Sequence, residues 1–367
     1  MLTRTLASLL CASLLAAPLC AGDDWPLFRH GDLQTGVATG SLPDKLEVLW
    51  KFTAKDSIES APAIVGETVY LASTDEHLYA IGLADGKEKW KYKAGGSFKS
   101  SPAVRNGLVY VGDQEGVFHC IDAEKGSKKW SFATGAEIDS SANFAGDKVL
   151  VGSYDENLYC FEAATGKVVW KFKTQGPVNC APAIVEGRAF VAGCDGTLRI
   201  VNIEDGKQLA EVDLKSQTGA SAAVHGDQIY VGNMDRTVLG IDWKKAAIVW
   251  EYENPDKAMP FYSSAAVTDD LVIIGGRDRL VHGINRKTGD KRWTFATRGK
   301  IDGSPAVAGN RVYVGSNDGN LYALDLKTGE KVWSEALGSA VTGSPAIGQK
   351  RLVIGTQDGI VYCFGAK

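Results

Sequence analysis

Several common functional signatures are missing from this chain of 367 residues. It has no C-x-x-C or C-x-x-C-H motif, which excludes the usual zinc clip and covalently attached c-type haem. It has no run of Lys or Arg, and its formal net charge is −4, so it lacks the positive surface typical of nucleic-acid or anionic-membrane binding. The five histidines do not cluster and share no repeat position, so they predict no metal or nucleophile system: His30, His77, His119, His225 and His282.

Long apolar runs are absent beyond the first 22 residues. Arg4 precedes an apolar stretch over residues 6–19, which is too short to span a bilayer and ends in Leu19-Cys20-Ala21. This pattern predicts a signal peptide over residues 1–22 and an exported protein, periplasmic or secreted. Leu19 is a poor neighbour for a lipid-modified cysteine, so we do not expect lipid anchoring at Cys20. Removal of Arg4 with this segment takes the formal charge from −4 to −5.

Two marks recur about every forty residues in the rest of the chain. One is a tryptophan, absent only at Ala210, and the other is a phrase of small residues such as Ser304-Pro305-Ala306. The tryptophans are Trp50, Trp90, Trp130, Trp170, Trp250, Trp293 and Trp333. A period of this length with several short strands per repeat is typical of a β-propeller, and eight small-residue phrases predict eight blades.

One repeat shows how a blade is built. Residues 304–308, 311–315, 320–325 and 331–334 are predicted to be four antiparallel strands separated by turns that contain Gly. The last repeat lacks its outer strand, whereas the chain begins with an unmatched one at Val48–Phe52. We therefore predict an all-β fold: a single eight-bladed β-propeller of four-stranded antiparallel blades over residues 46–367. In it the N-terminal strand closes the last blade, and residues 23–45 form a leader segment packed on the propeller.

The end of each repeat carries a more specific motif, Cys120-x-Asp122-x-x-x-Gly126-x-x-x-Trp130 in the second repeat. It resembles the tryptophan-docking motif of quinoprotein dehydrogenases and of BamB-type outer-membrane assembly scaffolds, and the resemblance covers about residues 25–365. The entry segment 24–29 is also similar to the start of many exported members of this superfamily. The fourth repeat departs from the motif at Ala210, where the others have Trp.

The resemblance implies one of three functions. The preferred interpretation is an exported, non-catalytic scaffold, monomeric, that binds an envelope or outer-membrane protein. The alternative is a dehydrogenase for alcohols or sugars that uses pyrroloquinoline quinone with Ca²⁺. The resembled enzymes stack a disulfide between adjacent cysteines on that cofactor, and this chain has no adjacent pair. The third is a carbohydrate-binding module of the envelope. We assign no catalytic residue, no metal ligand and no resident cofactor.

Two sets of equivalent residues are candidates for a site. The residues just before each inner strand are expected at the mouth of the axial channel, either as a mildly acidic site for a cation or polar ligand or as solvated loop residues: Glu59, Lys99, Asp139, Asn179, Gly219, Tyr262, Asp302 and Thr342. An acid also recurs in one hairpin turn of every repeat, where it is expected to cap its own backbone. These acids are Asp75, Glu115, Asp155, Asp195, Asp235, Asp278, Asp318 and Asp358.

Two local features complete the prediction. The one irregular loop, residues 253–262, is expected either to present Met259, Phe261 and Tyr262 as contacts for a partner or to pack on a neighbouring blade. Cys180 and Cys194 face each other across a predicted strand pair, where either a disulfide or two unpaired thiols fit. Cys120, Cys160 and Cys363 occupy a repeat position filled elsewhere by Ala or Gly, and are predicted to be small buried residues.

Overall fold

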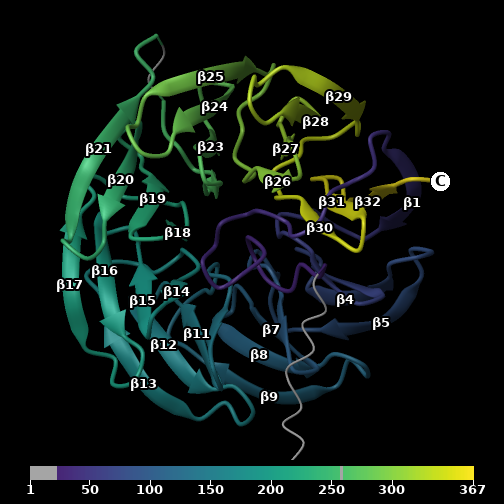
Figure 1. Cartoon of the computed structure of the whole chain (residues 1–367). Helices are drawn as coiled ribbons and strands as arrows, with labels where there is room; N and C mark the ends of the chain where they lie inside the picture. Colours follow the sequence, from purple (N-terminus) through teal and green to yellow (C-terminus); the bar gives the residue numbers. More distant parts are fainter. Residues whose placement is uncertain (1–22, 257–258) are drawn as a thin grey trace, which may run out of the picture.

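A computed structural model describes residues 23–256 and 259–367, and in this part of the chain 32 strands form eight four-stranded sheets and no helix. The sheets are arranged as blades around a central axis (Figure 1). This confirms the predicted eight-bladed β-propeller. The signal-peptide prediction, including Cys20, falls on residues 1–22 and lies outside the described residues. Within the described ranges, no helix has the length and apolarity needed to cross a membrane.

Each blade runs from an inner strand at the axis to an outer strand at the rim. Blades one to four consist of β2 (Ala63–Val65), β3 (Thr68–Ala72), β4 (His77–Gly82) and β5 (Glu88–Lys93); β6 (Ala103–Arg105), β7 (Leu108–Gly112), β8 (Val117–Asp122) and β9 (Lys128–Ala133); β10 (Asn143–Ala145), β11 (Lys148–Gly152), β12 (Asn157–Glu162) and β13 (Val168–Lys173); β14 (Ala183–Val185), β15 (Arg188–Val191), β16 (Thr197–Asn202) and β17 (Gln208–Asp213).

The other four blades repeat this plan. They consist of β18 (Ala223–His225), β19 (Gln228–Gly232), β20 (Thr237–Asp242) and β21 (Ala247–Glu253); β22 (Ala266–Val267), β23 (Leu271–Gly275), β24 (Leu280–Asn285) and β25 (Lys291–Ala296); β26 (Ala306–Ala308), β27 (Arg311–Gly315), β28 (Asn320–Asp325) and β29 (Lys331–Ala336); β30 (Ala346–Gly348), β31 (Arg351–Gly355), β32 (Ile360–Gly365) and β1 (Glu47–Thr53).

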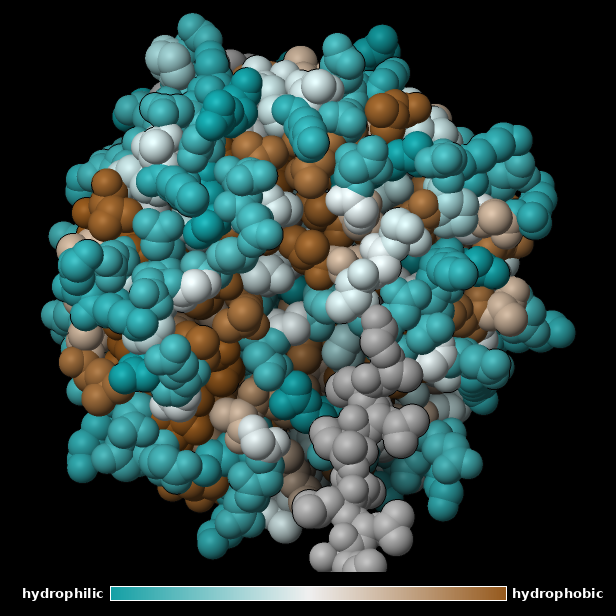
Figure 2. Space-filling view, viewed as in Figure 1, coloured by the Kyte–Doolittle hydropathy of each residue, from teal (hydrophilic) through white to brown (hydrophobic). Residues whose placement is uncertain are grey.

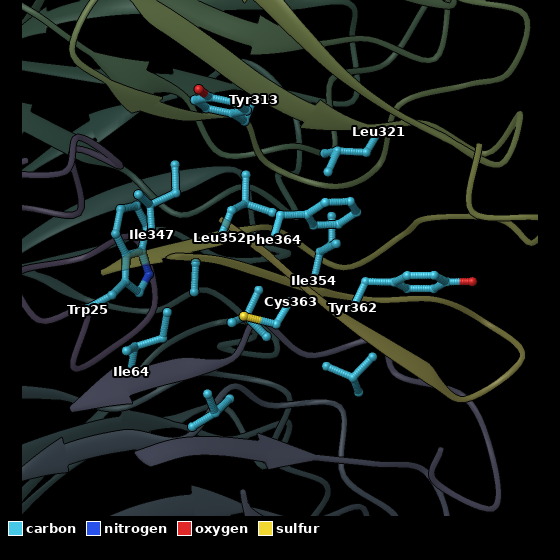
Figure 3. Packing of buried hydrophobic residues seen from close by; sticks show 14 of the residues in the cluster. Trp25, Ile64, Tyr313, Leu321, Ile347, Leu352, Ile354, Tyr362, Cys363 and Phe364 are labelled. Atoms are coloured by element: carbon cyan, nitrogen blue, oxygen red, sulfur yellow. The ribbon is translucent and has the colours of Figure 1, made fainter. Parts of the chain in front are cut away.

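The eighth blade is closed by the N-terminal strand, as predicted. β1 pairs antiparallel with β32, and Trp50 lies opposite Cys363. The side chains around this closure form one buried cluster with those of blades one and seven (Figure 3). Because the first and last strands of the chain pair in one sheet, neither end of the chain leaves a blade incomplete.

The strand register explains why a small residue recurs beside the tryptophan. In blade two, Tyr110 lies opposite Cys120, and Cys120 lies opposite Trp130, so a large ring flanks this position on each side. In blade six the residue is Gly283, and a Cβ there would collide with the indole of Trp293. Cys120 is fully buried, as are Cys160 and Cys363. The prediction of small buried residues at this position is confirmed.

The seams between neighbouring blades are fastened at the rim by the tryptophans. In six seams the indole N–H of an outer-strand Trp donates to a backbone carbonyl of the next blade, at 2.8–3.1 Å. The indole face lies on the turn glycine of that next blade, and a Cβ on Gly126 would come within 2.6 Å of Trp90. Gly126 also has φ +68°, which favours glycine. The glycine and the tryptophan of one motif therefore serve two different seams.

A second set of hydrogen bonds between neighbouring blades lies at the axis. In six seams a backbone N–H at the start of one inner strand donates to a serine Oγ of the next blade, at 2.8–2.9 Å. We call the acceptors the axial serines: Ser101, Ser141, Ser221, Ser264, Ser304 and Ser344. The two remaining blades carry Ala61 and Ala181 at this position, so their seams lack this bond.

The leader (residues 23–45) crosses the centre of the ring, in purple in Figure 1. Between Asp23 and Ala38 its backbone forms hydrogen bonds with all eight blades. Six inner strands donate a backbone N–H to it, and blade three uses the side chain of Asn143. Trp25 is buried beside Ile64 of blade one and Ile347 of blade eight (Figure 3).

On the face of the propeller that Figure 1 shows, most surface residues are hydrophilic, and hydrophobic residues are exposed between them (Figure 2).

Candidate functional site

The propeller axis holds a cavity of about 460 Å³. Its wall is formed by the axial serines and the two alanines that replace them, and Phe28 of the leader also lines it. The leader is bonded to the inner strands at Ile64 and Val104, beyond Ala61 and Ser101 along each strand. The leader therefore closes one end of the channel, and the mouth lies at the other end, where the chain enters the inner strands.

All eight residues predicted at the channel mouth line this one cavity. Each lies four residues before its inner strand, as Glu59 does before Ala63. We call them the inner mouth ring: Glu59, Lys99, Asp139, Asn179, Gly219, Tyr262, Asp302 and Thr342. The repeat therefore identified the positions correctly, because every blade has the same backbone path into its first strand.

A second ring of residues at the mouth was missed. Tyr154, Cys194 and Met234 line the same cavity, and Arg277, Asn317 and Gln357 line an adjoining pocket of about 340 Å³. With Thr74 and Gln114 they form the outer mouth ring. Each of the eight donates its backbone N–H to a carbonyl two residues before the inner mouth ring of its blade, at 2.9–3.2 Å. The sequence did contain a signal, because each of these residues immediately precedes the turn acid, and the eight positions hold seven different residue types.

The mouth has an apolar side, made by blades three to six. Tyr154, Cys194, Met234 and Tyr262 all line the cavity there. Gly219 lies beside these side chains, and a Cβ on it would make ordinary contact with the ring of Tyr262 at 3.4 Å and with Met234 at 3.6 Å. The guanidinium of Arg277 stacks on Tyr262 at 3.5 Å from the ring centre and so fixes the aromatic ring in place.

The rest of the mouth is polar, and the charges around the mouth as a whole are balanced. Asp302 accepts from Arg277 Nε at 2.7 Å and lies 3.0 Å from Lys300 Nζ. Three acids (Glu59, Asp139 and Asp302) therefore meet three bases (Lys99, Arg277 and Lys300). The expectation of a mildly acidic mouth was wrong, because it counted the inner mouth ring alone and missed Arg277 and Lys300.

Asp139 interacts with two neighbouring side chains, Gln114 of blade two and Tyr154 of its own blade. It accepts a hydrogen bond from Gln114 Nε2. Burial raises the pKa of the Tyr154 hydroxyl, and the charge of Asp139 and a hydrogen bond to it raise it further. Tyr154 therefore stays protonated at neutral pH and is held at the mouth as a neutral hydrogen-bonding group.

The mouth residues do not fit a quinone held with Ca²⁺. That ion takes six to eight oxygen ligands, whereas the mouth carboxylates come from blades one, three and seven and do not converge. Across the described ranges, no three His, Cys, Asp or Glu side chains are grouped so that they could hold a metal ion. Asp302 is also engaged with Arg277 and Lys300. We derive no chemical step through such a cofactor.

Five of the eight recurrent turn acids accept a backbone N–H of their own turn: Asp75, Asp155, Asp195, Asp278 and Asp318. Asp155 accepts from the backbone N–H of Asn157 and of Gly135, and from the hydroxyl of Tyr159. Asp75 and Asp318 repeat this pattern. In blade two the residue two positions earlier takes over, since Asp113, not Glu115, caps the turn and pairs with His119. In blade five Asn233 likewise accepts the N–H of Thr237, and in blade eight Asp358 accepts from the Thr356 hydroxyl. The capping interpretation therefore agrees with five of the eight turns.

The irregular loop does not expose all three of its predicted contact residues. Phe261 is 1% exposed and packs edge-on against the ring of His282, 5.3 Å away. The expectation of an exposed Phe261 was wrong, because the loop turns inward and fills the space that Gly232 leaves open. Met259 is 40% exposed, and Tyr262 belongs to the channel mouth. The adjacent residues 257 and 258 are outside the described ranges.

Cys180 and Cys194 are both free thiols. Of the two alternatives, the structure therefore has the unpaired one. Cys180 is buried, whereas Cys194 is partly exposed and lines the cavity. Burial raises the pKa of both thiols, so neither is an activated nucleophile at neutral pH.

Comparisons with known proteins agree with this architecture. The model of the family described as outer membrane protein assembly factor BamB matches residues 43–142, 133–259 and 254–367. No curated protein matches the chain. BamB from Moraxella catarrhalis superimposes with a TM-score of 0.73 at 19% identity, covering 88% of this chain and 98% of that one. Quinohemoprotein alcohol dehydrogenase from Comamonas testosteroni superimposes with a TM-score of 0.81 at 13% identity, covering 94% and 81%.

A third similar structure is the computationally designed Ika8 protein, with a TM-score of 0.76, 19% identity and coverage of 90% of this chain and 99% of that one. At such identities the superpositions show the fold alone, which scaffolds, enzymes and a designed protein share. The family model spans the whole propeller. With its eight closed blades, this chain belongs to the BamB family of β-propeller repeat proteins.

Proposed function

We propose that the protein is a non-catalytic scaffold of the cell envelope whose channel mouth binds a segment of a protein partner. The observation that supports this most is the contrast within the outer mouth ring. The backbone of all eight residues is held by the same hydrogen bond, yet the side chains include an aromatic ring, a thiol, a thioether, amides and a guanidinium. A uniform frame that presents varied side chains is suited to recognition of a surface or segment.

The chemistry of the mouth suits a peptide segment. The apolar side offers Tyr154 and Met234 to a hydrophobic side chain. On the polar side, Thr342 Oγ1 and Asn317 Oδ1 are buried and have no hydrogen-bond partner among the described residues. Both residues line the mouth pocket, so a rotation of either side chain would let it pair with an incoming backbone and relieve the cost of the unpaired atom.

The partner is proposed to be an exported or outer-membrane protein, in keeping with the description of the family. The test is affinity capture from an envelope extract, with the captured proteins identified by mass spectrometry. The double variant Tyr154→Ser/Met234→Ser should lose an outer-membrane protein that the native chain retains. Val332→Ser changes an exposed residue on the outer strand of blade seven and should retain it. Equal capture by all three proteins would contradict a role for the mouth.

The dehydrogenase alternative is tested separately. The purified protein is mixed with pyrroloquinoline quinone and Ca²⁺, and dye reduction is followed with alcohols and sugars. A stoichiometric, redox-active complex would overturn the scaffold proposal. A carbohydrate-binding role would instead be revealed by retention of the native protein, and not of the double variant, on envelope polysaccharide.

A further inference from the structure

The leader carries a buried cation at the centre of the ring. Arg29 is 1% exposed, and its Nη2 donates to the carbonyl of Ala265 in blade six at 3.1 Å. Its Nε and Nη1 atoms are also buried and have no hydrogen-bond partner among the described residues. These two atoms carry three of the five N–H groups of a guanidinium. Most donors of this side chain are therefore left without an acceptor.

The charge of Arg29 is also unbalanced. Burial lowers the pKa of Arg29 to about 9, and no carboxylate in the described ranges acts against this. The guanidinium therefore remains charged at neutral pH. The other buried arginine of the described chain, Arg199, lies 2.6 Å from the carboxylate of Asp195. Because a buried charge is costly unless it is paired, Arg29 lacks the kind of partner that Arg199 has.

The backbone of the leader fixes the guanidinium in this position. Arg29 has φ +60°, a conformation that is uncommon for residues other than glycine. Gly36 has φ +64°, and a Cβ on it would collide with the guanidinium. The guanidinium therefore packs against leader backbone that only glycine leaves open.

The guanidinium lies beside the closed end of the axial channel. Phe28 precedes Arg29 and Ser264 precedes Ala265, and both Phe28 and Ser264 line the axial cavity. The axial serines of this cavity each accept a backbone N–H, but in the part of the chain that the structure describes their own O–H groups have no acceptor. A serine hydroxyl can donate and accept at once. A ligand at this end of the channel therefore meets hydroxyl donors and a cation.

We propose that Arg29 binds a small monovalent anion, a halide or a carboxylate, at the closed end of the channel. Such an ion only accepts hydrogen bonds, which suits the unpartnered N–H groups and the serine hydroxyls, and its single charge balances that of Arg29. A divalent anion would leave a buried negative charge in excess. This inference is independent of the channel-mouth proposal, because the leader holds Arg29 whether or not a partner binds.

The test is the melting temperature of the protein prepared without residues 1–22, followed over about a hundredfold range of sodium chloride and of sodium formate. The ionic strength is held constant with sodium isethionate, whose anion is bulky. A ligand that binds only the folded state stabilises it as its concentration rises, so the native melting temperature should increase with either anion. Arg29→Met should weaken the apparent anion affinity at least tenfold.

Arg105→Met is the matched control. Arg105 also contacts the leader, but it is paired with Asp32 at 2.7 Å, so this variant should keep the dependence on anions. If Arg29 served only as a packing residue, Arg29→Met would lower the melting temperature by the same amount at every anion concentration. That result would overturn the proposal.

A second measurement uses the native protein alone and covers the case in which Arg29→Met does not fold. Crystals grown with sodium bromide or with sodium formate should show the ion within hydrogen-bond distance of Arg29 Nε or Nη1. The anion that acts at the lower concentration in the melts identifies the site as one for a halide or for a carboxylate. The proposal fails if neither ion is found there, or if the native melting temperature depends on neither anion. Gln34, whose Oε1 is also buried and unpartnered, would then be the candidate partner of Arg29.

Discussion

The axial serines offer the sharpest test of how the ring is held together. Ser221→Ala removes the Oγ that accepts the backbone N–H of Ala181 at 2.8 Å, and Ala181 is buried. A buried N–H left without an acceptor costs about 1–3 kcal/mol, so we expect the free energy of unfolding to fall by that amount. For a chain of this size the melting temperature should drop by roughly 1–4 °C.

The chain offers the reverse experiment at the seam between blades eight and one. Ala61 occupies the position of an axial serine, so Ala61→Ser should supply an acceptor for the backbone N–H of Ser344. The gain should be about 0.5–1.5 kcal/mol, since six other blades show that the site holds a hydroxyl. Both variants are measured by urea denaturation, with Ser131→Ala on an exposed outer strand as the control. If Ser221→Ala and the control lose the same stability, the axial bonds do not fasten the seams.

Three further outcomes follow from the turns and the thiols. Burial of Asp155 opposes its ionisation, but hydrogen bonds from Tyr159 and from backbone N–H groups outweigh burial and lower the pKa of Asp155. The stability that the ionised Asp155 contributes is therefore present above the unfolded pKa of about 3.9 and is lost as the pH falls through the folded pKa. Asp155→Asn should thus make stability, measured by thermal melting, less dependent on pH in the acid range. Gly126→Ala should destabilise the protein by more than about 2 kcal/mol through positive φ and collision with Trp90, whereas Gly107→Ala, also at positive φ but in open space, should cost only about 1 kcal/mol in the same melts. In the folded protein prepared without residues 1–22, only Cys194 should react with a thiol reagent, and its rate should rise at a higher pH than that of an ordinary thiol because burial raises its pKa. Reaction of the buried thiols without denaturant would contradict this.

The architecture was predictable because the repeat carries it many times over. A tryptophan at the rim and small residues at the axis recur in nearly every blade, so a departure such as Ala210 did not obscure the pattern. The closing strand was predictable by counting, since Trp50 had no repeat of its own and the last repeat had no outer strand.

The details of the mouth were less accessible, because side-chain direction after a strand depends on contacts with the neighbouring blade. Arg277 reaches the mouth only because its backbone is bonded to the carbonyl of Pro260, in the connection that leads into the same blade. Phe261 is buried because Gly232 of the neighbouring blade leaves room for it. Both contacts recur at equivalent positions of the other blades, so the repeat held a signal for them, which the three extra residues of the irregular loop obscured.

The leader's bonds to every blade have a consequence for biogenesis. Its residues are synthesised first, yet their acceptors and donors extend to Gln349, near the end of the chain. Contacts separated by so many residues form slowly, because the intervening chain must be ordered before they can be made. A polypeptide that stops before the final blade can complete neither the leader's circuit nor the pairing of β1, so shortened products should stay open and be vulnerable to proteases.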